Sequence, residues 1–458
     1  MFRDFKIKLG YAPTRRTLPF PDPKYAIENE KKIRNKTLEI LEKLGNVELV
    51  TLDEVNEEGL LRDLMEADTV AELFKEKKVD ALFAPHANFG CEEAVARLAK
   101  KLGVPVLLWA PVDDSFPERV TDSQCGLFAT SSALLHLNIP FDYIINCRPD
   151  DPEFEEGLEQ FIRVASVVKE FRNMRIAHVG SRPQAFLSVR YNENELCEKL
   201  GIEVVAVDTT ELIDTFNTTL EKFGHEIDAC IEGINKKMDI SKMDPEKLRR
   251  SAAAQLTLSH IAKAHGCNAM ASQCFELFQS FGDIWPCSAF GNLTEEFLPV
   301  ACETDVLGAI SSALLQAAAR GECSTFLTDL CVRHPENKNS ELLWHCGVFP
   351  PSLAKDGKAR VEDMCVNMYE LKQGEITICR FGGINGEYLL FADEAKTGYG
   401  PKTDSTYIWA EFDDWAAWEK KFIYGPYVHH VSVTYGKYAK VLHEACKYFN
   451  EVSADYIG

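Results

Sequence analysis

The order of apolar and polar positions predicts alternating strands and helices in the first third of the chain. Short apolar runs predict strands at Ile7–Tyr11, Val47–Thr51, Val79–Ala84 and Val104–Trp109. Amphipathic spacing between these runs predicts helices at Tyr25–Leu44 and Glu92–Lys101. Strands that alternate with helices form βαβ units, and we therefore expect a parallel sheet.

A second series of the same kind begins near residue 170. A helix is predicted from Pro152 to Lys169, and strands follow at Met174–Gly180 and Ile202–Asp208. Longer helices are predicted at Leu248–His265 and Asp305–Ala319. We expect two consecutive doubly wound, Rossmann-like α/β domains, residues 1–170 and 171–325.

The pattern changes from about residue 325, where long helix patterns disappear until Tyr438–Phe449. Glu375–Phe381 and Glu387–Ala392 flank a Gly/Asn-rich turn and predict a hairpin. Val428–Tyr435 predicts a further strand. Residues 326–458 are expected to form a β-rich, barrel-like C-terminal domain.

The composition narrows the function classes. The 458-residue chain carries a formal net charge of −21, with acidic residues along its whole length. Nucleic-acid binding needs basic stripes, so neither nucleic acid nor an anionic membrane is an expected partner. Three features predict a cytoplasmic protein. The N-terminus is charged, no apolar run reaches the roughly 18–20 residues that span a bilayer, and the fifteen cysteines show no Cys-x-x-Cys spacing.

Two polar loops follow predicted strands of the first domain, where parallel sheets bind ligands. One contains Arg15 and Arg16, and the other contains His86 and Asn88. Neither loop has a Gly-rich dinucleotide fingerprint, so NAD and ATP are not predicted. Both loops are candidates for binding a small or neutral ligand.

The strongest chemical signal is a series of metal-ligand residues in the second half of the chain. Glu303, Asp329, His345 and the pair His429–His430 each lie beside an apolar stretch. This mixture of carboxylate oxygens and imidazole nitrogens suits an octahedral ion of the manganese type better than tetrahedral zinc.

Some of these residues also have a purely structural interpretation. Glu303, Thr304 and Asp305 precede a predicted helix and could only cap it, although a cap at Thr304 or Asp305 leaves Glu303 free. His345 could be a core histidine, because Trp344 and Val348 surround it with apolar groups.

The paired histidines are harder to explain by packing alone. If His429 and His430 both lie in a strand, their rings point to opposite faces. Only one of them is then expected to bind the metal, while the other packs or forms hydrogen bonds.

In order and context, these segments resemble the L-fucose/L-arabinose isomerase family, over nearly the whole chain. Ala301–Asp305 resembles the family segment with the first metal-binding glutamate. Asp329 falls at the second acidic ligand, which is an aspartate in the fucose branch. His430 matches the C-terminal ligand histidine, and His345 falls where the arabinose branch has a ligand histidine. The chain is shorter than typical members and combines features of both branches.

The resemblance implies an aldose–ketose isomerase that works through a cis-enediol and uses Mn²⁺, with Mg²⁺ or Co²⁺ as alternatives. It assigns the metal to Glu303, Asp329 and His430, with His345 as a ligand or a substrate contact. Glu303 and Asp329 are the expected proton-transfer pair. The implied architecture, two α/β domains and a β-rich domain, agrees with the pattern above.

Sugar recognition is expected from other residues. The resemblance assigns Gln273 to sugar hydroxyls and Arg15 or Arg16 to a site in a neighbouring subunit, which implies a homo-oligomer, a trimer or hexamer. The substrate stays open among pentoses, 6-deoxyhexoses and C6-substituted hexoses such as a sulfonated sugar. A non-catalytic sugar-binding or sensor protein and a divalent-metal epimerase or hydrolase are the alternatives.

Overall fold

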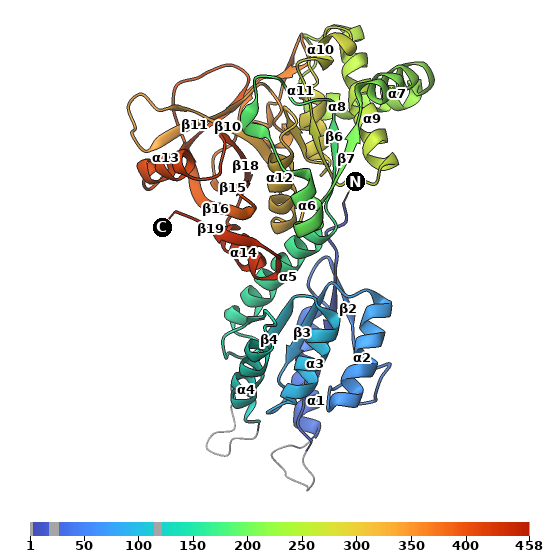
Figure 1. Ribbon diagram of the computed structural model, residues 1–458, viewed down its shortest axis with the longest axis vertical. Helices are drawn as coiled ribbons and strands as arrows, with labels where there is room; N and C mark the ends of the chain where they lie inside the picture. Colours follow the sequence, from blue (N-terminus) through green and yellow to red (C-terminus); the bar gives the residue numbers. More distant parts are fainter. Residues whose placement is uncertain (1–2, 18–26, 114–120, 458) are drawn as a thin grey trace. The chain divides into compact units, whose positions relative to one another are not determined.

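A computed structural model of the chain describes residues 3–17, 27–113 and 121–457 (Figure 1). The chain divides into two compact units. The N-terminal unit consists of Phe5–Lys169, and the main unit joins Met1–Asp4 to Glu170–Gly458.

A parallel sheet of five strands forms the centre of the N-terminal unit, in the order β2-β1-β3-β4-β5. Its strands are β1 (Ile7–Tyr11), β2 (Val47–Val50), β3 (Ala81–Pro85), β4 (Val106–Trp109) and β5 (Asp142–Tyr143). Apolar runs such as Ala81–Pro85 are buried throughout, as expected for strands covered on both faces.

Helices cover both faces of this sheet. The helices are α1 (Ile27–Leu41), α2 (Leu64–Lys77), α3 (Glu92–Leu102), α4 (Ser123–His136) and α5 (Pro152–Arg172). Side chains of α2, α3 and α4 share one apolar core with β3 and β4. Side chains of α1 and α5 share another core with β1, β3 and β4.

The main unit begins with a second parallel sheet, in the order β7-β6-β8-β9. Its strands are β6 (Arg175–Val179), β7 (Glu203–Val207), β8 (Ala269–Ser272) and β9 (Val300–Cys302). The helices of this part are α6 (Glu193–Leu200), α7 (Thr209–Lys222), α8 (Gly224–Lys237), α9 (Pro245–Ala264), α10 (Leu277–Ser280) and α11 (Cys287–Glu295). Asp208 and Asp244 accept backbone hydrogen bonds at the starts of α7 and α9, which explains where these helices begin.

The rest of the main unit is a barrel of mainly antiparallel strands. Its sheet has the order β14-β17-β11-β10-β18-β15-β16-β19, and pairing of β16 with β17 closes it. The strands are β10 (Phe326–Arg333), β11 (Ser340–His345), β14 (Tyr369–Glu370), β15 (Glu375–Ile384), β16 (Glu387–Gly398), β17 (Thr406–Glu411), β18 (His430–Tyr435) and β19 (Val452–Asp455). A short pair, β12 (Val361–Glu362) and β13 (Val366–Asn367), lies outside this sheet.

Helix α12 (Val306–Ala318) connects the parallel sheet to the barrel. Every residue of α12 is buried. It packs against β6, β8 and β9 on the parallel-sheet side and against β10, β15 and β18 of the barrel. A single apolar core, formed by side chains of other elements, also runs from the parallel sheet into the barrel. The start of α12 is held at the junction of the two, which is where the candidate site lies.

The α/β class with parallel sheets and a barrel-like C-terminal region is confirmed, while the doubly wound, Rossmann-like description stays a prediction. The long helix predicted at Tyr25–Leu44 is α1, with Tyr25 itself outside the described residues. The sequence pattern missed α13 (Trp415–Tyr424), which lies between β17 and β18 within the predicted β-rich region. Its buried side chains are aromatic, Trp415 and Trp418, so it lacks a long apolar stripe. The predicted last helix is α14 (Ala439–Ala445).

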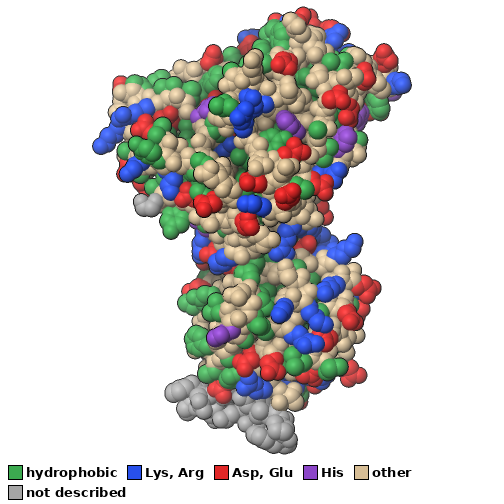
Figure 2. Space-filling view, in the orientation of Figure 1, with side chains coloured by type: hydrophobic (Ala, Val, Ile, Leu, Met, Phe, Trp, Pro, Cys, Tyr) green, Lys and Arg blue, Asp and Glu red, His purple; other side chains and the backbone are tan. Residues whose placement is uncertain are grey.

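Basic and acidic side chains are interspersed on the face seen in Figure 2, without a basic stripe. Among the described residues, no helix is both long and apolar enough to cross a bilayer. All fifteen cysteines are free thiols.

Candidate active site

The predicted ligands meet where the carboxyl edge of the parallel sheet approaches the barrel. Glu303 directly follows β9, while Asp329 lies in β10 and His430 begins β18. Asp329 and His430 are directly opposite each other in the antiparallel β10–β18 pair. Three segments that are distant in the sequence therefore present their side chains to one place.

The distances confirm that these side chains form one cluster. His430 Nε2 lies 3.1 Å from Glu303 Oε2 and 3.5 Å from Asp329 Oδ1. His430 is buried, while the Asp329 side chain is 21% exposed and therefore reachable from solvent. His430 Nε2 and Asp329 Oδ1 are buried atoms without a hydrogen-bond partner among the described residues.

His429 also contacts this cluster, contrary to the expectation from strand alternation. Its Nε2 lies 3.7 Å from Asp329 Oδ1, and its side chain is 52% exposed. Strand β18 begins only at His430, so the alternation of side chains does not extend back to His429. Both histidines therefore lie near Asp329.

Asp305 fixes the orientation of the His430 ring. Its Oδ2 lies 2.9 Å from His430 Nδ1, an arrangement in which the ring N–H donates to the carboxylate. Arg380 donates two hydrogen bonds to the same carboxylate, of 2.6 and 3.0 Å, and the backbone N–H of Gly308 donates a third. Because Nδ1 faces Asp305, Nε2 is the ring nitrogen that faces Glu303 and Asp329, where a cation would bind. Ligand histidines in metalloproteins are commonly held in this way.

The charges in this group determine its protonation. Burial raises the pKa of Asp305, but the Arg380 guanidinium and the His430 ring lower it by more, so the pKa lies below its ordinary value. Burial lowers the pKa of His430, but Asp305 and Glu303 raise it by more, to about 10. A divalent ion at Nε2 has to displace this proton, so metal binding and proton release are coupled.

The donor set fits a hard divalent ion. Two carboxylates and one imidazole nitrogen converge, and two of the converging atoms have no hydrogen-bond partner of their own. Oxygen-rich ligand sets of this kind are typical of Mn²⁺ and Mg²⁺.

The backbone at Glu303 is strained. Glu303 and Thr304 have φ values of +63° and +57°, a region that non-glycine residues seldom adopt, least of all a β-branched threonine. The turn is held by hydrogen bonds from Thr304 N to Ser272 O and from Asp305 N to Cys302 O, both 3.2 Å long. Such strain costs of order 1–3 kcal/mol per residue and is concentrated at functional sites. Here it aims the Glu303 carboxylate at His430 while Asp305 caps α12, so Glu303 is not the cap.

His345 lies beside the cluster, with its ring centroid 6.2 Å from that of His430. Its Nδ1 accepts a hydrogen bond of 2.9 Å from the backbone N–H of Cys346. Burial lowers the pKa of His345, so the ring is neutral and its proton lies on Nε2. That Nε2 is buried without a hydrogen-bond partner among the described residues. In this arrangement His345 is suited to donate to a substrate oxygen rather than to bind a metal.

Gln273 lies at the same edge of the sheet, directly after β8. It is buried, and its Oε1 accepts a hydrogen bond from the backbone N–H of Glu276. Its Nε2 has no hydrogen-bond partner among the described residues. An amide donor fixed in this way suits a sugar hydroxyl.

The other predicted substrate residues lie in the N-terminal unit. Asn88 accepts hydrogen bonds from the backbone N–H groups of Arg16 and Gly90 and donates to Glu30. The Arg16 guanidinium lies 3.8 Å from the centroid of the Phe89 ring.

His86 is fully buried in the same unit. Its ring nitrogens contact Trp109 O at 3.3 Å and Thr130 Oγ1 at 2.9 Å. Burial lowers the pKa of His86 to about 4, so this ring is neutral. Substrate binding by Arg16, His86 and Asn88 stays a prediction.

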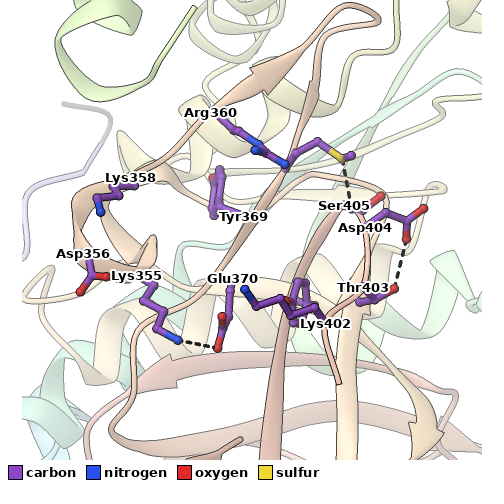
Figure 3. Close-up of a pocket in the computed structure, with 12 residues that line it drawn as sticks. Lys355, Asp356, Lys358, Arg360, Tyr369, Glu370, Lys402, Thr403, Asp404 and Ser405 are labelled. Carbon is purple, nitrogen blue, oxygen red and sulfur yellow. Dashed lines mark hydrogen bonds and ion pairs between the residues drawn. The ribbon is translucent and has the colours of Figure 1, made fainter. Parts of the chain in front are cut away.

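A separate hollow of 380 Å³ lies at β14 and the loop before β17 (Figure 3). It contains none of the predicted site residues. Its lining mixes cations with acids, and Lys355 is paired with Glu370 at 3.0 Å. The cluster around His430, rather than this hollow, brings the predicted metal-ligand side chains together.

Sequence reasoning missed two members of the site, Asp305 and Arg380. Asp305 was considered only as a helix cap. Arg380 lies in the predicted strand Glu375–Phe381, where a lone arginine among apolar residues was the one available signal. Arg380 is only 2% exposed, and a cation at such depth needs a buried acid.

Comparison with known proteins supports the resemblance. Residues 23–172 match the model of the fucose/sulfoquinovose isomerase N-terminal domain, a range that covers most of the N-terminal unit. A sulfoquinovose isomerase of Priestia aryabhattai is 26% identical over 81% of this chain and 83% of its own length. One of Alkalicoccus urumqiensis is 26% identical over 69% of this chain and 72% of its own length. Over most of its length the chain is therefore similar to sulfoquinovose isomerases, in keeping with the resemblance to the L-fucose/L-arabinose isomerase family, and it is an aldose–ketose isomerase.

Proposed function

We propose that the chain interconverts sulfoquinovose, an aldose with a sulfonate at C6, and the corresponding ketose with the help of a divalent ion. The observation that carries the proposal is the Glu303–Asp329–His430 cluster, in which Asp305 holds the ring so that His430 Nε2 faces both carboxylates. The substrate comes from the relatives, which bear the name sulfoquinovose isomerase.

Glu303, Asp329 and His430 would hold the ion, for which Mn²⁺ is our first choice and Mg²⁺ or Co²⁺ are alternatives. Such an ion supplies Lewis-acid stabilisation of the negative charge that develops on the C1 and C2 oxygens. Asp305 and Arg380 keep the His430 ring in the ligating orientation, because both are buried and joined by two hydrogen bonds.

The isomerisation itself moves a proton between C2 and C1. Glu303 and Asp329 are the proposed pair for this transfer, one accepting the proton from carbon and the other assisting its return. Positioned acids and bases of this type contribute about 10²–10⁴-fold in rate. His345 Nε2–H and the Gln273 amide are proposed to donate to sugar oxygens, because both are buried donors without a partner among the described residues.

The sulfonate needs a cation and further hydrogen-bond donors. We assign it to a hollow of 230 Å³ lined by Arg190, Asn192 and Asn385. Leu307 also lines the hollow. Because Leu307 lies in the first turn of α12, the hollow adjoins the helix end that Asp305 caps. Glu195, the acid in this lining, accepts a hydrogen bond of 2.9 Å from Tyr388. The exposed Arg190 is the residue that we expect to meet the sulfonate.

The substrate is tested by comparing sulfoquinovose with 6-deoxyglucose, which lacks the sulfonate. Loss of a charge-assisted hydrogen bond costs about 1.5–3 kcal/mol, so Arg190→Met should lower kcat/KM for sulfoquinovose about 10–100-fold and leave 6-deoxyglucose unaffected. Arg182→Met is the matched control, because the Arg182 guanidinium already donates to the carbonyls of Pro183 and Gln184. Equal losses for both sugars would contradict the assignment.

The reaction class is tested in deuterated water with Mn²⁺, with the product identified by NMR. Formation of the ketose with deuterium at the reacting carbon supports isomerisation. Tight sugar binding without turnover would favour the sensor alternative, and exchange at C2 without ketose would favour an epimerase.

A further inference from the structure

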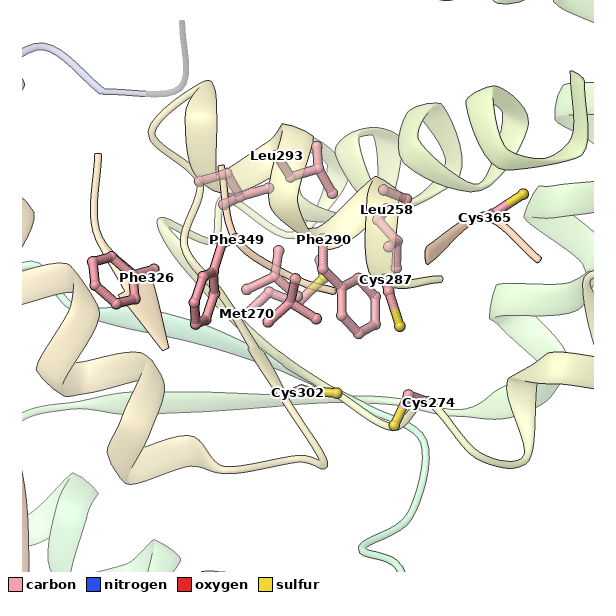
Figure 4. Close-up of a cluster of buried hydrophobic side chains, with 14 of the residues drawn as sticks. Leu258, Met270, Cys274, Cys287, Phe290, Leu293, Cys302, Phe326, Phe349 and Cys365 are labelled. Carbon is pink, nitrogen blue, oxygen red and sulfur yellow. The ribbon is translucent and has the colours of Figure 1, made fainter. Parts of the chain in front are cut away.

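Two thiols lie against the cluster on the side of the parallel sheet. Cys302 is the last residue of β9, and Cys274 follows the neighbouring strand β8 by two residues. Figure 4 shows both thiols at these adjacent strand ends, below the apolar core. Cys274 and Cys302 are buried, with exposed fractions of 5% and 1%, and both are free thiols.

The two sulfur atoms and a carboxylate oxygen of Glu303 all lie within 4.8 Å of one another. A tetrahedral zinc ion with Zn–S bonds of about 2.3 Å separates two thiolate ligands by about 3.8 Å. The three groups therefore need only a small adjustment to bind one ion. Two sulfur ligands and one oxygen ligand select soft or borderline ions such as Zn²⁺ and Cd²⁺ over Mn²⁺ or Mg²⁺.

Glu303 belongs to this group and also to the His430 cluster. The carboxylate that meets the thiols reaches to 3.1 Å from His430 Nε2. An ion held by Cys274 and Cys302 would bind the Glu303 carboxylate, which the proposed isomerase reaction also needs.

We propose that Cys274, Cys302 and Glu303 form a thiophilic-metal site that competes with the isomerase centre for Glu303. Zn²⁺ or Cd²⁺ at this site inhibits the enzyme. The inhibitory part rests on the proposed role of Glu303, whereas the binding part does not.

Cd²⁺ provides a test with two independent signals. Cd²⁺–thiolate bonds absorb in the ultraviolet, so binding is measured on the full-length protein without any assay of activity. The variants are Cys274→Ala, Cys302→Ala and the double variant. Cys147→Ala is the control, since Cys147 is a buried thiol of the N-terminal unit. Circular dichroism checks that each variant is folded.

The Cd²⁺ equivalent that the wild-type protein binds most tightly should produce the thiolate absorbance and, in parallel, inhibit sugar turnover. Removal of either thiol should abolish this absorbance and raise the inhibitory Cd²⁺ concentration by at least about tenfold, while Cys147→Ala behaves as wild type. The same tight absorbance in the double variant would overturn the site. Loss of the absorbance with unchanged Cd²⁺ inhibition would overturn the sharing of Glu303. Failure of the proposed function would instead appear as a wild-type protein that binds Cd²⁺ at the thiols but turns over no sugar.

Discussion

The predicted site residues of the two units differ in how completely their side chains are paired. In the N-terminal unit, His86 and Asn88 use their polar atoms on neighbours in the same unit. In the main unit, Gln273 at the sheet edge and His345 on the barrel strand β11 each keep a buried nitrogen without a hydrogen-bond partner among the described residues. Leaving such an atom unpaired costs about 1–3 kcal/mol. That cost is expected where a ligand supplies the missing partner.

Backbone strain separates the two units in the same way. Glu303 and Thr304 hold consecutive positive φ values at the edge of the main-unit sheet. In the loop of the N-terminal unit that carries His86 and Asn88, the positive φ falls on Gly90, where it costs little. The main-unit edge therefore stores backbone strain at Glu303 and Thr304, whereas the loop around Gly90 in the N-terminal unit does not.

The sharpest test of this difference is Glu303→Gln, which should lower kcat by about 10²–10⁴-fold because a proton-transfer group is lost. The measurement is sulfoquinovose turnover at saturating Mn²⁺, with bound metal determined on the same sample. Glu198→Gln, an exposed change on α6, is the control. Near-wild-type turnover of both Glu303→Gln and Asp329→Asn with metal bound would refute the assignment.

Asp305→Asn should weaken Mn²⁺ binding about 10–100-fold, because His430 loses the group that fixes its ring. It should also destabilise the fold by about 3–5 kcal/mol, since the buried Arg380 loses its counter-charge. Calorimetric titration and thermal unfolding measure the two effects. Asp244→Asn, which alters the cap of α9, should leave Mn²⁺ affinity unchanged.

The pH dependence of metal binding addresses His430 directly. Its pKa of about 10 exceeds the ordinary value of about 6.5. Without a bound ion, the protonated ring therefore contributes its full stabilisation of the fold below about pH 6.5, and this contribution is lost as the pH rises through about 10. Mn²⁺ must displace this proton, so affinity should rise up to about tenfold per pH unit in that window. Titration calorimetry in buffers of different ionisation enthalpy counts the protons released. An affinity that does not change between these limits would contradict the scheme.

The smallest expected effect comes from the fully paired loop. His86→Gln removes a buried ring with two partners and should destabilise the protein by about 1–3 kcal/mol. Because both nitrogens are engaged inside the unit, KM should stay near the wild-type value. A raised KM with unchanged thermal stability would instead support the predicted substrate contact.

Much of this arrangement could be predicted from the sequence, because strand ends and helix starts are local signals. The strand at Val428–Tyr435 and the helix at Asp305–Ala319 follow from periodicity, and the resemblance then assigned Glu303, Asp329 and His430 to one centre. The pairing of Arg380 with Asp305 could not be predicted in that way. The two residues are 75 positions apart and meet only because α12 packs against β15. His429 was misjudged for a related reason, since the exact first residue of β18 decides where its ring points.

The path of the chain through the two units has a consequence for engineering. The chain starts in the main unit, where Arg3 pairs with Glu170 at 2.9 Å, and it returns there only after Lys169. Within the N-terminal unit, Lys169 Nζ donates to Lys6 O at 2.8 Å, so the two ends of that unit adjoin. Along the sequence, the N-terminal unit is therefore inserted into the main unit, the host that contains Glu303, Asp329 and His430. A chain with Phe5–Lys169 replaced by a short Gly/Ser bridge would show whether the host alone keeps a competent metal centre.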